Sequence, residues 1–195
     1  MADLSWSKLR AAVGRCRECP LWETRNNAVF GEGPEDSPVL LVGEAPGAEE
    51  DSSGRPFVGR SGRFLTDLMA EAGLRREDLF ISNVVHCRPP GNRNPKKGEI
   101  RACLHWLEDI VALLRPQVVV TVGNVPSRTI IDTKEGISTL RGRFHHGRLG
   151  GMDLTIRPIF HPAYLLRNRS REVGSPVSST LEDLRTLVGF VKTTS

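Results

Sequence analysis

Residues 39–47 read VLLVGEAPG, a continuous apolar run that passes directly into a turn rich in Gly and Pro. Three other stretches repeat this plan of an apolar, β-branched run followed by polar residues or Gly: residues 80–85 (FISNVV), 118–122 (VVVTV) and 155–160 (TIRPIF). Runs that are apolar at nearly every position, and not only at every second one, are typical of strands buried on both faces. We therefore predict four strands in the centre of the fold.

Helical patterns lie between these runs. Apolar side chains recur at helical spacing over residues 65–72 and 100–114, and Pro116 is expected to end the second of these helices. A last helix is predicted from about Ser179, with Glu182 completing a capping box. Strands that alternate with helices predict right-handed crossovers. We therefore expect an α/β fold in which a parallel sheet lies between two layers of helices.

Length and hydropathy restrict the class of protein further. A chain of 195 residues is expected to form a single domain over residues 1–195. No apolar run approaches the roughly 20 residues that a membrane helix needs, so a membrane partner is not expected. The first ten residues, MADLSWSKLR, lack the apolar core of a secretory signal, which predicts a cytoplasmic location.

Charge is distributed unevenly along the chain, whose net charge is +4. Residues 32–51 contain seven acidic residues and no Lys or Arg. Residues 141–171 contain seven Arg against the single acid Asp153, and residues 88–101 contain five cations against Glu99. Basic loops of this kind suit a polyanionic partner, and a separate acidic segment can supply a carboxylate for chemistry. Charge scattered over a solvated surface is the alternative.

The four cysteines are Cys16, Cys19, Cys87 and Cys103. The first two form a C-x2-C pair, and disulfides are not expected in a chain without an export signal. Four thiols of which two are so closely spaced suit a sulfur-ligated metal site, either zinc or an iron–sulfur cluster. Four independent buried thiols are the alternative. A metal here would hold the basic loop at residues 88–98 in shape for DNA.

Polar residues follow the predicted strands at their carboxyl ends, where ligands bind in open parallel sheets. Glu44 follows the first strand, in a turn over residues 43–47 whose backbone N–H groups can point into a cleft. Phe57 lies in a loop between Pro and Gly residues, where its ring can stack on a planar base. Ser61 opens a helix whose N-terminus can accept a phosphate.

Two further groups lie at the same predicted edge of the sheet. The amide of Asn83 offers one donor and one acceptor, which is the pattern needed to read a pyrimidine. His161 can donate to a developing negative charge. Leu165 and Leu166, next to Arg167, are expected to be exposed as a wedge for a duplex. Each residue alone also has a structural explanation, such as core packing or capping, but their joint position favours a site.

Together these motifs resemble those of the family-4 uracil-DNA glycosylases. The resemblance is carried by GEAPG (43–47), PFVG (56–59), the strand with Asn83, CRPPGNR (87–93) and HPAYLLRN (161–168). It covers most of the chain and implies an αβα sandwich around a four-stranded parallel sheet. It also implies hydrolysis of the N-glycosidic bond of deoxyuridine in DNA, which releases uracil and leaves an abasic site. The four cysteines fall where this family ligates a 4Fe–4S cluster.

The resemblance also implies roles for individual residues. Phe57 resembles the ring that stacks on uracil, Asn83 the amide that reads it, and His161 the histidine near uracil O2. The candidate catalytic residues are Glu44 and His161, and Ala45 joins them with Phe57 and Asn83 around uracil. The candidate DNA contacts are Ser61, Arg88, Arg93, Leu165 and Arg167.

The expected partner is uracil-containing DNA, double- or single-stranded, bound by a monomer in the cytoplasm of a bacterium or archaeon. A non-catalytic or covalent uracil-DNA binding protein of the same superfamily is the alternative. Some relatives bond covalently through a His in an Arg-rich loop, and residues 88–98 contain no His, which favours an enzyme that turns over. An iron–sulfur electron carrier is disfavoured because the cysteines are spread along the chain beside base-reading motifs.

Overall fold

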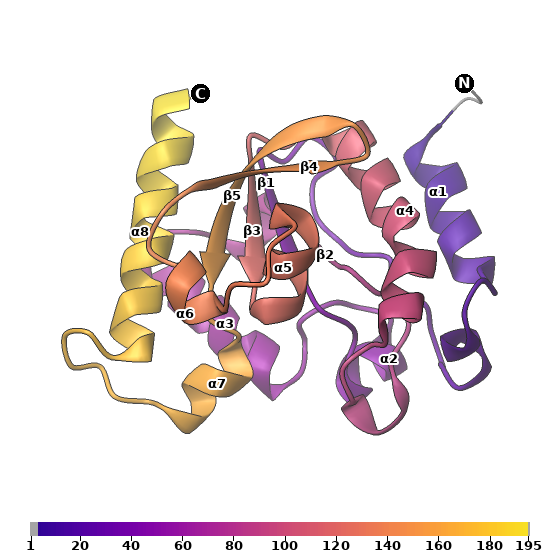
Figure 1. The fold of residues 1–195 in the computed structure, drawn as a ribbon, viewed down its shortest axis with the longest axis horizontal. Coiled ribbons are helices and arrows are strands. Elements are labelled where there is room, and N and C mark those ends of the chain that lie inside the picture. The colour runs from indigo at the N-terminus through magenta and orange to yellow at the C-terminus, as the bar shows by residue number, and fades with distance from the viewer. Residues whose placement is uncertain (1–3, 195) are drawn as a thin grey trace.

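The computed structural model describes residues 4–194, and the side chains of residues 4–193. One five-stranded sheet lies between two layers of helices (Figure 1). The strands are β1 (Val39–Gly43), β2 (Phe80–Asn83), β3 (Val118–Val122), β4 (His145–Leu149) and β5 (Met152–Ile159), in the order β2-β1-β3-β5-β4. The expected fold class, a three-layer α/β sandwich, is confirmed.

The four predicted runs are the four parallel strands β1, β2, β3 and β5. The sequence did not predict β4, which pairs antiparallel with β5 at the edge of the sheet. Its residues, HHGRL, alternate between half-buried and exposed positions up to a buried Leu149, because an edge strand keeps one side in water. The sheet therefore has five strands where four were expected.

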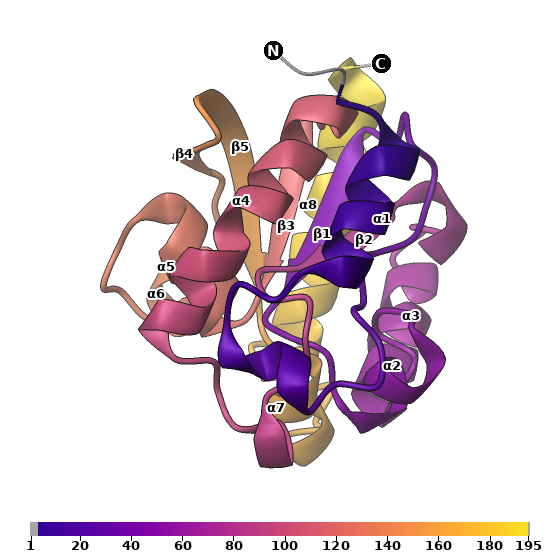
Figure 2. The same cartoon turned by 90° about the vertical axis from the view of Figure 1, so that its right-hand side faces the viewer.

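The helices are α1 (Trp6–Arg15), α2 (Ala48–Ser53), α3 (Arg60–Glu71), α4 (Lys97–Leu114), α5 (Asn124–Ile131), α6 (Ile137–Leu140), α7 (Pro162–Arg167) and α8 (Pro176–Thr194). Short 3-10 turns are η1 (Pro20–Glu23), η2 (Arg76–Asp78) and η3 (Pro90–Asn92). Figures 1 and 2 show α1 and α4 on one side of the sheet and α8 on the other. Among residues 4–194, no helix combines the length and the apolar character needed to cross a bilayer.

The core has two halves, one on each face of the sheet. Leu40 and Val42 of β1 pack in the half that includes α1 and α4, whereas Val39 and Leu41 pack in the half that includes α3 and α8. Successive side chains of a strand point to opposite faces, so a strand covered on both faces is apolar at every position. This packing explains the continuous apolar runs in the sequence.

The last helix begins earlier than predicted. Pro176, and not Ser179, is the first residue of α8, and the N–H of Ser179 already donates to the carbonyl of Ser175 at 2.9 Å. The hydroxyl of Ser175 accepts from the N–H of Ser178 at 3.3 Å, which caps the first turn. The predicted capping box of Ser179 and Glu182 is therefore wrong, because a proline favours the first helical position and starts the helix ahead of it.

Candidate functional site

A cleft of about 570 Å³ opens at the carboxyl ends of the parallel strands. In Figure 1 the arrowheads of these strands point to the end of the molecule where α2 and α7 lie. The lining residues come from the segments 44–50, 57–62, 89–94 and 161–167 and from Asn83. The structure thus brings together eight of the predicted site residues, namely Glu44, Ala45, Phe57, Ser61, Asn83, Arg93, His161 and Arg167.

Phe57 and Asn83 meet across a glycine. Asn83 ends β2, is only 2% exposed and pairs in register with Gly43 of β1. A β-carbon at Gly43 would collide with the Asn83 amide oxygen and with the Phe57 ring. The absence of a side chain at residue 43 therefore lets an aromatic face and an amide edge lie next to each other in the cleft.

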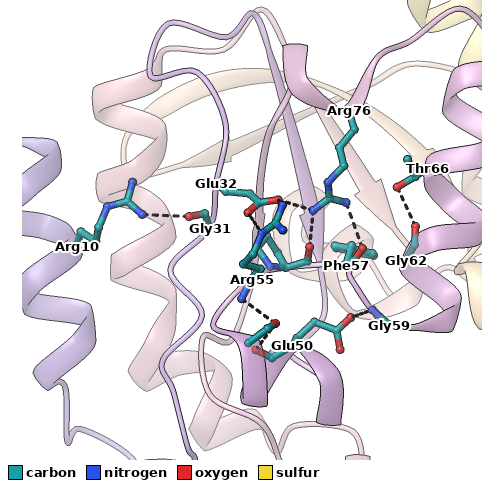
Figure 3. A network of polar contacts seen from close by, with 12 residues as sticks. Arg10, Gly31, Glu32, Glu50, Arg55, Phe57, Gly59, Gly62, Thr66 and Arg76 are labelled. Carbon is teal, nitrogen blue, oxygen red and sulfur yellow. Dashed lines mark hydrogen bonds and ion pairs between the residues drawn. The ribbon is translucent and has the colours of Figure 1, made fainter.

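The backbone of Phe57 adopts an unusual conformation. Its φ of 50° lies in the left-handed region, which a bulky residue rarely occupies. Gly62 in the first turn of α3 passes so close that a β-carbon there would overlap the Phe57 backbone. The guanidinium of Arg76 donates to the Phe57 carbonyl at 3.1 Å (Figure 3). The ring is therefore held by its surroundings and not by local preference.

Glu44 is half-buried in the cleft wall, and this burial raises the pKa of its carboxyl group above the ordinary value. The Glu44 carbonyl accepts from the N–H of Val85 at 3.0 Å, which ties the turn after β1 to the segment after β2. A partly desolvated carboxylate at a fixed position can stabilise a nearby positive charge or orient a water molecule.

A second carboxylate connects two walls of the cleft. Glu50 of α2 accepts from the N–H of Gly47 at 3.1 Å and from the N–H of Gly59 at 2.7 Å, so it joins the turn after β1 to the Phe57 loop. Glu50 is not among the predicted site residues, because Gly47 has no side chain to complete the usual capping-box signal and only the Glu50 half of the box is present. Glu50 occupies the Gly47 N–H, and Pro46 has no N–H, so neither of these two residues offers an N–H group to a ligand.

His161 is the N-cap residue of α7, and its immediate surroundings determine which ring nitrogen carries the proton. Its Nδ1 accepts a hydrogen bond of 3.2 Å from the N–H of Ala163. Burial, with a contribution from the positive charge of Arg167, lowers the pKa of His161 below its ordinary value. A neutral ring whose Nδ1 accepts must carry its proton on Nε2, which is then a hydrogen-bond donor.

The basic residues of the loop after β2 are less free than their charges suggested. Arg93 lines the cleft, but its guanidinium makes two hydrogen bonds of 2.9 and 2.7 Å to the buried carboxylate of Glu99. Arg88 lies outside the cleft lining, and its Nε donates to Asn92 Oδ1 at 2.7 Å. The single acid counted in this segment thus neutralises Arg93, the predicted arginine of this loop that reaches the cleft.

The predicted wedge is wrong for Leu165. This residue is fully buried and packs in the half of the core that includes α3 and α8. The helical turn of α7 directs it inward and presents Tyr164, which is 39% exposed and lines the cleft. The Tyr164 ring also packs on Phe160, with 5.2 Å between centroids. Sequence analysis missed Tyr164 because the motif alone does not say which face of α7 is buried.

The four cysteines line a second, smaller pocket between the segment after α1 and α4. Three N–H groups point at their sulfur atoms: the Arg25 guanidinium at Cys87 (3.0 Å), the Trp106 indole at Cys16 (3.4 Å) and the His86 backbone at Cys103 (3.4 Å). Burial raises the pKa of Cys103 to about 12. Four thiols with N–H donors around them fit a cluster with thiolate ligands, whose charge such donors stabilise.

The four thiols, all within the part of the chain that the structure describes, share a pocket but are not placed to ligate a single metal ion. Within the described residues, no three His, Cys, Asp or Glu side chains are placed so that they could hold one metal ion. The four thiols nevertheless share one pocket, which disagrees with four independent buried cysteines.

Comparisons with known proteins place these features in a family. The model of the uracil DNA glycosylase superfamily matches residues 30–185. A type-4 uracil-DNA glycosylase of Thermotoga maritima is 46% identical over 181 residues, which cover 92% of this chain and 91% of that protein. A type-4 enzyme of Pyrobaculum aerophilum is 40% identical over 82% of this chain and 84% of its own. A type-5 uracil-DNA glycosylase of Thermus thermophilus is 34% identical over 69% and 68%.

Proposed function

Because the chain belongs to the uracil DNA glycosylase superfamily, we propose that it excises uracil from DNA as a repair enzyme. It hydrolyses the N-glycosidic bond of deoxyuridine, releases free uracil and leaves an abasic site. The observation that carries this function is the single cleft in which Phe57, Asn83 and His161 meet. A non-catalytic or covalent binder of the same superfamily is not favoured, since relatives that are 46% and 40% identical to this chain are named as glycosylases.

The target nucleotide reaches the cleft by leaving the duplex. A base within a stack cannot be approached, and extruding it costs a few kcal/mol, least at a mismatch. Arg167 and the first turn of α3, which contains Ser61, line the cleft and can hold the phosphates beside the extruded nucleotide. Tyr164, exposed at the same rim, can stack against a base that stays behind.

Inside the cleft, the pyrimidine is sorted by stacking and by hydrogen bonds. The Phe57 ring covers one face of the base, and the buried Asn83 amide donates to O4 and accepts from N3–H of uracil. Cytosine presents the opposite pattern at these atoms, which leaves buried groups unpaired at roughly 1–3 kcal/mol each. This arrangement supports a preference for uracil over cytosine.

Bond cleavage leaves a uracil anion and a sugar with oxocarbenium character. The Nε2–H of neutral His161 donates to the anion at O2, and the hydrogen bond from Ala163 keeps that proton in place. Glu44 faces the same cleft and stabilises the positive charge on the sugar while it orients the attacking water. Its raised pKa keeps it closer to neutrality than an exposed carboxylate, so this role depends on pH.

A 4Fe–4S cluster on Cys16, Cys19, Cys87 and Cys103 is part of the proposal. The shared pocket and the N–H donors toward the sulfur atoms support it. When bound, the cluster would supply a structural cross-link. It would fasten the segment after α1 to α4 and to the start of the basic loop at residues 88–98, which contributes to the cleft wall.

We also propose that residues 1–195 form a single domain that acts as a cytoplasmic monomer. One sheet shared by both halves of the core supports the single domain. The origin of the relatives in bacteria and archaea supports the location. Size-exclusion chromatography with light scattering tests the oligomeric state.

The proposed activity is tested on an oligonucleotide with one uracil. After incubation with the protein, hot alkali cleaves the strand at abasic sites, and chromatography detects free uracil. We expect strand cleavage and release of uracil in equal amounts, with a visible absorption from the cluster. A stable complex without free base would instead identify a binding protein and overturn the proposed activity.

A further inference from the structure

We propose that Arg76 and Glu32 are positioning residues that hold the Phe57 ring against the base. The inference rests on the proposed function, because it assigns to Phe57 the role of stacking on uracil. Neither residue lines the cleft. Figure 3 shows that both side chains contact the segment of Arg55 to Phe57, which carries the ring.

Glu32 provides a fixed anchor on the sheet. Its N–H donates to the carbonyl of Ile81 at 3.0 Å, and its carbonyl accepts from the N–H of Ile81 at 2.8 Å, which adds an antiparallel bridge to β2. The backbone of residue 32 is thereby tied to the strand that ends at Asn83. The Glu32 side chain therefore begins at a point that is fixed relative to Asn83, the residue that reads the base.

The carboxylate of Glu32 binds two guanidinium groups. Arg76 donates to it at 2.7 Å, and Arg55 donates to it at 2.8 and 3.2 Å. Burial of Glu32 by itself raises its pKa, but the two arginines outweigh this and hold the pKa below its ordinary value. The Glu32 carboxylate is thus charged at neutral pH. It binds Arg55, two residues before Phe57, and Arg76, which contacts the Phe57 loop.

Arg76 connects the Glu32 carboxylate to the backbone of the loop that carries the Phe57 ring. One of its nitrogens donates to the Phe57 carbonyl at 3.1 Å, and the nitrogen that binds Glu32 also donates to the carbonyl of Pro56. The guanidinium of Arg76 donates from two separate nitrogens to a carboxylate and two successive carbonyls, whereas a lysine would have to donate from a single nitrogen. The side chain is largely buried, so solvent competes little for these bonds.

The hydrogen bonds from Arg76 are needed because of the backbone conformation of Phe57. Its left-handed φ is unfavourable for an aromatic residue, and this conformation places the ring next to Gly43 and Asn83. Gly62 packs against the backbone of Phe57, and Arg76 donates to the Phe57 carbonyl. Without Arg76, the loop is free to relax toward an ordinary conformation, and the ring leaves its place beside the amide.

The test compares Arg76→Gln with the matched control Arg75→Gln. Arg75 is the preceding residue, is highly exposed and pairs with Asp78, so its loss removes the same charge without touching the Phe57 loop. We expect Arg76→Gln to lower kcat/KM on uracil-DNA by up to about 100-fold, which is the loss that a small misplacement of the substrate can cause. Arg75→Gln should leave kcat/KM unchanged. Equal activity of the two variants would overturn the proposal.

A double-mutant cycle separates positioning from general stability. In a Phe57→Ala background the ring is absent, so Arg76→Gln should add no further loss of kcat/KM. A loss of the same size in both backgrounds would mean that Arg76 acts elsewhere and would overturn the proposal. If Arg76→Gln does not fold, Arg76→Lys replaces it, with an intermediate loss expected because it keeps the charge but not the second carbonyl bond.

A readout independent of catalysis distinguishes this proposal from the proposed function. The ring signals of Phe57 in a 13C-labelled sample are assigned by their absence in Phe57→Ala. We expect them to shift in Arg76→Gln and Glu32→Gln and not in Arg75→Gln, whether or not uracil is released. Unchanged ring signals would overturn the positioning role, and a wild-type protein that releases no uracil would overturn the function alone.

Discussion

The N–H of Ala163 donates a hydrogen bond of 3.2 Å to Nδ1 of His161, two residues earlier at the start of α7. This bond fixes the tautomer of a half-buried imidazole, because Nδ1 cannot carry a proton while it accepts one. The Nε2–H that results is the group available to the cleft. In the proposed reaction, this Nε2–H is the preorganised donor for the uracil anion.

Replacing His161 is expected to impair turnover more than binding. In His161→Ala we expect the single-turnover rate of uracil release to fall by about 100- to 1000-fold, as on removal of a preorganised donor. The dissociation constant for DNA should change much less, since phosphate contacts dominate affinity. The control is His146→Ala, which removes an exposed imidazole from β4. A parallel loss of affinity and rate would contradict the role of His161 at the anion.

The rate of uracil release should fall as the pH is lowered, which gives the pH–rate profile an acid limb. Burial, with the charge of Arg167, lowers the pKa of His161, so the ring stays neutral as the pH falls through the ordinary value of 6.5 and is protonated only below it. Glu44 has a raised pKa and also loses its charge on the acid side. Arg167→Gln removes a positive charge, so the His161 pKa should rise and the limb should move to higher pH. A limb that moves to lower pH would contradict this electrostatic contribution.

Selection of uracil over cytosine should depend on the Asn83 amide. An Asp at this position can only accept when ionised, so Asn83→Asp loses the donor for O4 and gains an acceptor for the cytosine amino group. We expect slower release of uracil and a higher ratio of cytosine to uracil release on matched oligonucleotides. The affinity for DNA without uracil serves as the internal control and should be unchanged. Unaltered activity and selectivity would contradict the assigned pocket.

The central strands could be predicted because both of their faces are buried, so hydrophobicity alone marks them. The strand β4 could not, because HHGRL is a polar edge strand that depends on β5 for its pairing. The predicted residues Asn83 and His161 lie in the cleft because the chain brings them to strand ends, where a parallel sheet collects them. The position of Asn83 and His161 near the ends of apolar runs in the sequence was sufficient to predict that they lie at this edge of the sheet.

Other features of the site depend on contacts that no local pattern encodes. The hydrogen bonds from Arg76 to Glu32 and to Phe57 join residues 44 and 19 positions apart. The pairing of Arg93 with Glu99 depends on the start of α4, so counting charges along the loop overestimated its free cations. The burial of Leu165 depends on which face of α7 meets the core, and α7 is too short for its periodicity to reveal this.

The roles of Leu165 and Tyr164 can be separated by stability and affinity. Leu165→Ala opens a cavity in the core, so we expect the free energy of unfolding to fall by roughly 2–5 kcal/mol. The affinity of the folded fraction for DNA should stay close to that of the wild type. Tyr164→Ala should do the reverse, with a modest change in stability and a loss of roughly 1–3 kcal/mol in DNA binding if its ring stacks on a base. Denaturant unfolding and fluorescence anisotropy measure the two quantities.

An outcome in which Leu165→Ala weakens DNA binding at unchanged stability would restore the wedge at residue 165 and contradict its burial. Tyr164→Phe is the matched control for the aromatic residue, because it keeps the ring and removes only the hydroxyl group. We expect its affinity for DNA to remain near that of the wild type.

The cysteine pocket makes a structural prediction that does not depend on catalysis. Cys87 precedes the basic loop at residues 88–98 and accepts from the Arg25 guanidinium at 3.0 Å. Cys87→Ala removes one of four proposed ligands, so iron content and visible absorption should fall, and the midpoint of thermal unfolding should decrease because a metal that binds only the folded state stabilises it. DNA affinity should fall as well, since this loop then loses its fixed end. Unchanged folding and unchanged DNA affinity in Cys87→Ala would contradict a structural role for the site.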